Sequence, residues 1–398
     1  MAIADQALTS GVSLIISLLL LKWSSIEQLG VFSAINALYL LFFSIFSSLI
    51  IDPMIVFFNG KYAESRKSYT SILYLALYST SIIIIVSCFA AYTFFSLTNE
   101  ASYAKASLIF IFFAISQLFF ALERRIMYAK SRSSLSVLGA LVAALLTLLL
   151  SYLVKETFVT SALSMMYTVT ISYLMGALIM RRARIMAESG ENDRNSDLKT
   201  ISVAKDHYYY GSWALMSSIV AWLPVNLYYL IGQAGEAESS GSLRILLMII
   251  LPAQLTVANL SYYLTPKMTR SSNKISLIKN YIIISIACCI TYYLLVIIFG
   301  KNIISFIEPK NEELVSYVKW FGLLPILTGV QTIVNSALRA AERTKEIFIS
   351  QIIASLISCA IGVLVFQIDP LTGAFWGLTA YYGILIIGMF VSLKKGGG

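Results

Sequence analysis

The side chains that could do chemistry in this chain are a few charged and amide groups in or beside long apolar stretches. The arginines matter most, because a guanidinium group binds a phosphate through two parallel hydrogen bonds. Together with three amides they form the predicted substrate-binding set: Arg244, Arg339, Arg124, Arg125, Asn226, Gln331 and Asn335. A plainer interpretation stays open, in which Arg244 snorkels to lipid headgroups and the other arginines anchor helix ends.

The clearest polar face lies between residues 328 and 339. Thr328, Gln331, Asn335 and Arg339 recur every three or four positions, so a helix places them on one side. Hydroxyl groups in a membrane bundle often do no more than join helices, but two amides and an arginine exceed that need. The spacing predicts that this face lines a polar cavity.

Two carboxylates, Asp5 and Asp52, are the acidic candidates, and each lies at the end of an apolar stretch. A carboxylate in such a place can bind a proton or a sodium ion and so couple a process to an ion gradient. It can equally well pair with Arg124 or Arg125. The sequence leaves both interpretations open.

Catalytic and metal-binding patterns are not apparent. His207 is the only histidine, and the sequence holds neither a Walker motif nor a convincing pair of nucleophile and base. The four cysteines lack the C-x-x-C spacing of zinc and redox sites. The sequence therefore predicts a protein that is not an enzyme and that has no metal or cofactor.

The elements that position these residues are apolar stretches without Asp, Glu, Lys or Arg. There are twelve: residues 6–21, 28–51, 68–99, 106–122, 133–154, 157–180, 207–235, 245–266, 280–300, 320–338, 347–368 and 370–393. About 20 apolar residues in a helix cross the hydrocarbon core of a bilayer. Hydrophobic residues make up 58% of the chain and charged residues 12%, far from the composition of a soluble domain. The chain is predicted to be an all-α integral membrane protein with twelve transmembrane helices.

The net charge of +9 is distributed unevenly between the loops on the two sides. With the N-terminus inside, 22 of the 29 basic residues fall in the inner loops. This split follows the positive-inside rule and argues against a nucleic-acid surface. It predicts cytoplasmic N- and C-termini.

The two halves of the chain show a faint repeat. Glu27 and Glu238 open similar segments, Pro53 corresponds to Pro266, and residues 121–125 resemble residues 337–339, at offsets of 211 to 216 positions. Because six spans bring the chain back to its starting side, the repeat predicts two six-helix lobes related by a pseudo-twofold axis along the membrane normal. The predicted boundaries are residues 1–182, a cytoplasmic linker at 183–206, and residues 207–395.

Several short motifs carry a family resemblance. Three of the motifs lie at predicted helix starts: Asp5, Gln6, Ser10 and Gly11; Glu27, Gly30 and Phe32; and Tyr210, Gly211 and Trp213. A fourth motif follows them and consists of Gly241, Leu243, Arg244, Leu251 and Pro252. Arg124, Arg125, Tyr128 and Ala129 fit the same pattern. The chain resembles the bacterial polysaccharide flippases of the O-antigen (Wzx) type. These belong to the multidrug/oligosaccharidyl-lipid/polysaccharide (MOP) exporter superfamily.

The resemblance implies a flippase of the bacterial inner membrane that translocates an oligosaccharide linked to undecaprenyl pyrophosphate by alternating access, for cell-surface polysaccharide assembly. The implied partners are the bilayer, the lipid-linked glycan and other polysaccharide-assembly proteins, and coupling would use protons or sodium ions. Two rival interpretations remain. One is a multidrug or small-molecule cation antiporter of the same superfamily, and the other is a membrane enzyme that acts on lipid-linked sugars.

Overall fold

The computed structural model describes residues 2–157, 159–188, 198–235, 237–270, 274–308, 311–341 and 343–394, and every regular element in them is helical. The elements are α1 (Ala2–Trp23), α2 (Ile26–Phe46), the π-helix η1 (Ser47–Ile51), α3 (Asp52–Phe57), α4 (Arg66–Leu97), α5 (Ala101–Ala129), α6 (Ser133–Thr157), α7 (Ala162–Glu188), α8 (Thr200–Gly235), α9 (Ala237–Arg270), α10 (Lys274–Ile307), α11 (Leu314–Phe321), α12 (Leu324–Ala340), α13 (Thr344–Phe366) and α14 (Pro370–Lys394).

The predicted membrane spans are largely present. Eleven segments of the described residues are long and apolar enough to cross a bilayer. The first predicted span corresponds to α1, whose apolar part, Leu8–Trp23, is shorter than the others. The chain is therefore a multi-pass helical membrane protein, with eleven candidate spans and one shorter apolar helix where twelve equivalent spans were predicted.

The chain divides into two compact units. Unit 1 comprises Met1–Gln28 and Leu38–Ser218, and unit 2 comprises Leu29–Ala37 and Ile219–Gly398. The boundaries fall inside α2 and α8 rather than in a loop. The predicted lobes and their symmetry remain predictions. In the predicted linker, α7 continues to Glu188 and α8 begins at Thr200, while residues 189–197 lie outside the described residues.

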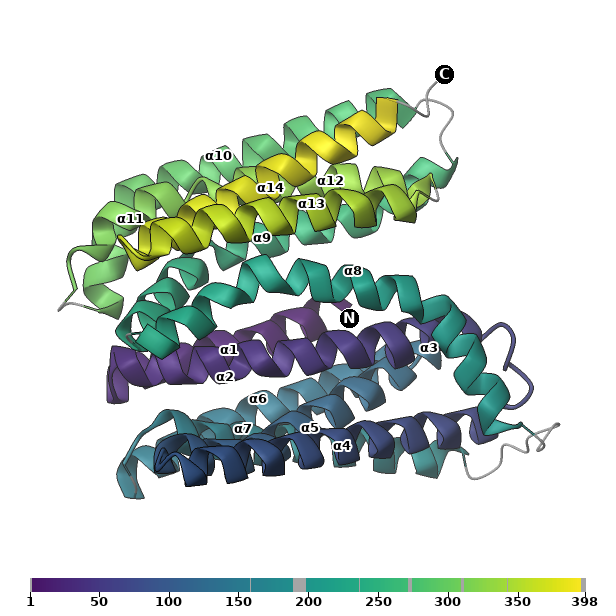
Figure 1. Ribbon diagram of the computed structural model, residues 1–398. Helices are drawn as coiled ribbons and strands as arrows, with labels where there is room; N and C mark the ends of the chain where they lie inside the picture. The colour runs from purple at the N-terminus through teal and green to yellow at the C-terminus, as the bar shows by residue number, and fades with distance from the viewer. Residues whose placement is uncertain are drawn as a thin grey trace. The chain divides into compact units, whose positions relative to one another are not determined.

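Unit 1 is built around α5. This helix packs against α4, α6 and α7, and the four helices run side by side in Figure 1. In the most apolar 18-residue window of α5, 67% of the positions are buried, against 33% in α4, 33% in α6 and 44% in α7. Most positions along this window of α5 are therefore enclosed by the neighbouring helices.

A proline shapes the end of the second span. Pro53 has no N–H to donate to the carbonyl of Leu49, and its ring would clash with that carbonyl in a regular α-helix. The chain forms a π-turn here instead, in which the Asp52 N–H bonds the Ser47 carbonyl. The Leu49 carbonyl accepts a hydrogen bond from Nδ1 of His207 on α8 at 2.9 Å, so the group that proline leaves unpaired has a partner.

Unit 2 contains a close helix pair formed by small residues. Helices α13 and α14 pack along their length, with Gly362 on one and Gly373 and Gly377 on the other. A Cβ at Gly377 of α14 would lie 3.1 Å from the Gly362 Cα of α13, and one at Gly373 would lie 2.4 Å from the Phe366 backbone nitrogen. Small residues let membrane helices approach closely without a cavity, so the glycines explain this contact.

Candidate functional site

The candidate site in unit 1 begins with two consecutive residues near the end of α5, Glu123 and Arg124. Successive residues on an α-helix point about 100° apart. Glu123 turns toward α4 and α7, and Arg124 turns toward α1. Each side chain meets an oppositely charged partner, so one turn of α5 carries two ion pairs that point in different directions.

Arg124 pairs with Asp5 of α1. The Arg124 Nε donates to Oδ2 of Asp5 at 2.5 Å. The Tyr128 hydroxyl donates to the same oxygen at 2.7 Å, and the Ser136 hydroxyl of α6 donates to Oδ1 at 3.1 Å. Asp5 is fully buried, whereas 14% of the Arg124 side chain is exposed. The carboxylate is thus surrounded by three donors while part of the guanidinium stays accessible.

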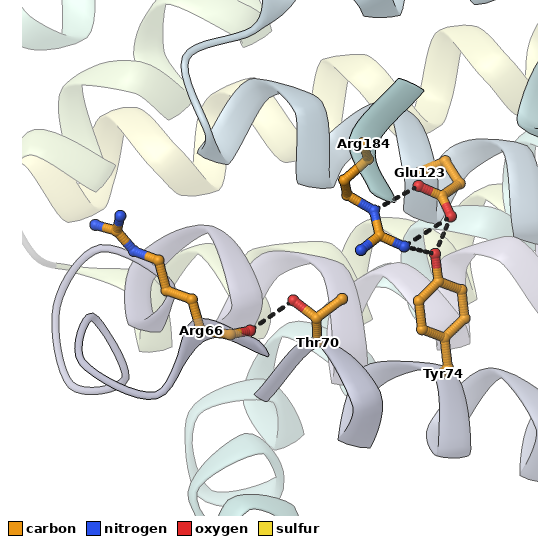
Figure 2. A network of polar contacts seen from close by, with 5 residues as sticks. All are labelled: Arg66, Thr70, Tyr74, Glu123 and Arg184. Atoms are coloured by element: carbon orange, nitrogen blue, oxygen red, sulfur yellow. Dashed lines mark hydrogen bonds and ion pairs between the residues drawn. The ribbon is translucent and has the colours of Figure 1, made fainter. Parts of the chain in front are cut away.

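Glu123 pairs with Arg184 of α7, as Figure 2 shows. The Arg184 Nε lies 3.3 Å from Oε2 of Glu123, and a terminal guanidinium nitrogen donates to the Tyr74 hydroxyl at 2.6 Å. That hydroxyl in turn donates to Oε1 of Glu123. All three side chains are buried, and they tie α4, α5 and α7 together.

Burial makes both pairs sensitive to the loss of one partner. Two charges taken out of water lose hydration, and their attraction offsets this only when the remaining hydrogen-bonding groups are satisfied. Here Tyr128 and Ser136 complete the shell of Asp5, and Tyr74 completes the shell of Glu123. Each of the two carboxyl groups therefore has an arginine and further hydrogen-bond donors beside it inside unit 1.

The other predicted residues of unit 1 lie in different surroundings. Arg125 is half-buried on α5, about 100° further around the helix than Arg124. Asp52 is exposed at the start of α3, where it accepts a hydrogen bond from the Ser47 hydroxyl at 3.3 Å. The structure therefore brings Asp5 together with Arg124, one of the two partners that the sequence left open.

Five predicted site residues belong to unit 2. Arg244 is half-buried on α9 and hydrogen-bonds the buried hydroxyl of Tyr229 on α8. Asn226 is buried one turn before Tyr229 and donates through Nδ2 to the Trp222 carbonyl at 3.0 Å. Part of the hydrogen-bonding capacity of both residues is thus used within the α8–α9 pair.

The polar face of α12 forms as its spacing predicted. Gln331 and Asn335 are half-buried, and Arg339 is exposed in the last turn of the helix. Gln331 accepts from the Thr332 hydroxyl at 3.4 Å. The Asn335 side-chain oxygen is buried and has no partner among the described residues. Such an oxygen is expected to meet a water or a ligand, and the cavity predicted along this face remains a prediction.

The sequence reasoning missed the Tyr74–Glu123–Arg184 network. The predicted cytoplasmic linker at 183–206 includes Arg184, because the charge-free stretch ends at residue 180, but α7 continues to Glu188. The signal that could have found it is spacing: Arg181 and Arg184 are three positions apart and share a helix face if the helix continues.

Comparison with known proteins identifies the fold. The chain matches no protein-family model and no curated protein sequence. Among solved structures it resembles the lipid II flippase MurJ in an inward closed conformation, with a TM-score of 0.79 and 14% identity over 98% of this chain and 87% of that one. It also resembles an inward-facing multidrug resistance transporter of the MATE family, of the MOP superfamily, with a TM-score of 0.77 and 13% identity over 99% and 96% of the two chains. A third similar structure is the MATE multidrug transporter DinF-BH, with a TM-score of 0.72 and 14% identity over 99% of this chain and 93% of that one. The chain therefore has the fold that MurJ and the MATE transporters share.

Proposed function

We propose that this protein is a transporter that moves an anionic, lipid-linked oligosaccharide across the membrane by alternating access. The proposed cargo is a glycan on a polyprenyl pyrophosphate carrier, destined for the cell surface. The fold is compatible with a lipid-linked cargo, since one of its structural neighbours is a lipid II flippase. The choice of cargo rests on the charges.

The observation that carries the proposal is the balance of charge at membrane depth. In unit 1 the buried carboxylates Asp5 and Glu123 each lie against an arginine. In unit 2, Arg244 is a half-buried charge on the part of α9 whose side chains the structure describes. A site for an organic cation needs a carboxylate that is available to it, whereas a site for a diphosphate needs available guanidinium groups. The described charges favour an anion.

A cation antiporter is the second candidate, because the MATE transporters match the fold over nearly the whole chain. The two candidates differ in what the charged residues do. A cation antiporter moves a cationic dye and gains nothing from Arg244. A diphosphate transporter depends on Arg244 and does not move a cationic dye.

The test uses the full chain in proteoliposomes with a fluorescent oligosaccharide on a short polyprenyl pyrophosphate. We expect translocation by the native protein and a loss of about tenfold or more in Arg244→Ala, since one charged hydrogen-bonding group contributes about 1.5–3 kcal/mol. Arg244→Lys reports whether a positive charge suffices, and Lys319→Ala, an exposed cation of unit 2, serves as the matched control. Transport of a cationic dye without movement of the pyrophosphate substrate would overturn the proposal.

Ion coupling is proposed at Asp5 and Asp52. The membrane potential supplies roughly 2.3 kcal/mol per charge per 100 mV, so a bound proton or sodium ion could drive the cycle. Asp5→Asn and Asp52→Asn are compared for transport with and without an imposed gradient. Unchanged, gradient-dependent transport in both variants would remove these carboxylates from the coupling step.

A further inference from the structure

Unit 1 contains a second feature that the proposed function does not use: an apolar groove between α4, α5 and α7. It encloses about 580 Å³. Its walls include Leu77, Ile85, Ile111, Ile115 and Leu174. Several of its lining side chains, Tyr78, Phe89 and Phe112 among them, are more than half exposed, so the groove opens on the surface of the unit.

The groove has one charged end. Arg181 lines it, together with Tyr74 and Phe119. The guanidinium carbon lies 4.9 Å from the centre of the Tyr74 ring and 5.9 Å from that of Phe119. Cation–π contacts at these distances hold an arginine in place without neutralising it. The positive charge of Arg181 is therefore fixed at one end of the otherwise apolar groove.

The neighbouring charges do not compensate Arg181. Arg184, one turn further along α7, is engaged by Glu123 and Tyr74 (Figure 2). Arg181 itself forms no ion pair with a carboxylate in the described part of the chain. A half-buried guanidinium with no protein counter-ion is suited to an external anion, and phosphate fits its two parallel donors.

The dimensions of the groove match a lipid chain. Its lining residues on α7 run from Thr170 to Arg181, about 16 Å at 1.5 Å per residue. Half of the hydrocarbon core of a bilayer is about 15 Å thick. A chain that starts at Arg181 and follows α7 thus reaches about the middle of the membrane, as the acyl chain of a phospholipid in one leaflet does.

We propose that the α4–α5–α7 groove binds an anionic phospholipid of the leaflet on the side of the basic loops, with its phosphate on Arg181 and one acyl chain along the groove. This site lies within unit 1 and does not depend on the proposed transport function. The bound lipid would act as a stabilising or regulatory ligand.

The test measures lipid binding to the full chain in detergent by native mass spectrometry, with phosphatidylglycerol and phosphatidylcholine of equal chain length. We expect phosphatidylglycerol to bind at least about tenfold more tightly, and Arg181→Gln to remove most of that preference. Arg181→Lys keeps the charge and should keep part of it. Arg182→Gln, an exposed neighbour on the same helix that does not line the groove, is the matched control and should bind as the native chain does.

A second measurement locates the bound lipid in the native chain, so the proposal can still be tested if an Arg181 variant does not fold. Phosphatidylglycerol with a photoreactive acyl chain should label peptides from α4, α5 and α7 in the native chain, and Thr170→Trp, which places a large side chain in the wall of the groove, should reduce that labelling. Equal binding of both lipids, equal losses in the Arg181 and Arg182 variants, or labelling elsewhere would overturn the proposal. Binding of a polyprenyl phosphate but not of phosphatidylglycerol would overturn the identity of the lipid.

Discussion

Neutralising Glu123 tests most directly whether the buried charge of Arg184 needs its partner for unit 1 to be stable. Glu123→Gln keeps the shape of the side chain and an acceptor for the Tyr74 hydroxyl, but it removes the negative charge beside Arg184. The Arg184 side chain is 5% exposed, so its charge cannot reach water without unpacking α7. Removing one partner of a buried pair costs about 3–5 kcal/mol, chiefly because the other charge is left buried and uncompensated.

The double variant separates an unpaired charge from lost packing. Arg184→Met alone leaves Glu123 buried and unpaired, and should cost a similar amount. In Glu123→Gln combined with Arg184→Met no buried charge remains, and replacing a whole buried pair by uncharged groups is often close to neutral. We therefore expect the double variant to lose only about 1 kcal/mol, far less than the sum of the two single losses.

The assay is reversible unfolding of the purified chain by SDS in mixed micelles, followed by tryptophan fluorescence. Glu346→Gln provides the control, because its pair with Arg343 is partly exposed, with the charged atoms 3.9 Å apart, and such pairs contribute about 1 kcal/mol or less. Additive losses in the double variant, or a Glu123→Gln loss no larger than that of Glu346→Gln, would refute the reasoning.

Three further outcomes follow from the contacts. Asp369→Ala should cost about 0.5–2 kcal/mol of unfolding free energy, because Asp369 caps α14 by accepting the Thr372 N–H at 2.9 Å. Burial alone would raise the pKa of Asp369, but its hydrogen bonds hold that pKa below its ordinary value. Thermal unfolding should therefore show the loss at neutral pH and a smaller loss on acidification below about pH 4. Gly211→Ala should lower the melting temperature, since its Cβ would lie 2.3 Å from a backbone carbonyl of the π-turn, whereas Gly383→Ala meets nothing within 4 Å and should change little. Asp5→Asn should reduce the amount of folded protein, an effect that a size-exclusion profile distinguishes from a loss of transport by folded protein.

The membrane spans were the most predictable part of the fold. A stretch without charges is a direct consequence of the cost of burying charge in hydrocarbon, so eleven candidate spans follow from composition alone. The residues at which the helices begin and end were less predictable. Helix α7 runs eight residues past its charge-free stretch and α8 starts seven residues before one, because a helix continues through charged residues as long as their side chains find water or a partner.

The polar contacts were harder to predict, because charge and spacing do not determine a partner. From the sequence, Asp5 is equally compatible with ion binding and with a pair to Arg124 or Arg125. The partner is Arg124, whose position on α5 directs its side chain toward α1. The only histidine of the sequence, His207, matches no motif. Its Nδ1 bonds the Leu49 carbonyl beside the π-turn at Pro53, a contact over 158 positions of sequence that no local pattern encodes.

The Asp5–Arg124 pair gives the two proposed roles of these residues a physical link. A proton on Asp5 would weaken its attraction for the guanidinium and so release Arg124 to bind an anion. Removing the Asp5 charge should likewise weaken the hold on Arg124, so Asp5→Asn protein that elutes as folded should bind a pyrophosphate-linked substrate at lower concentrations than the native chain does. Equal or weaker binding by folded Asp5→Asn would show that the pair does not restrain Arg124.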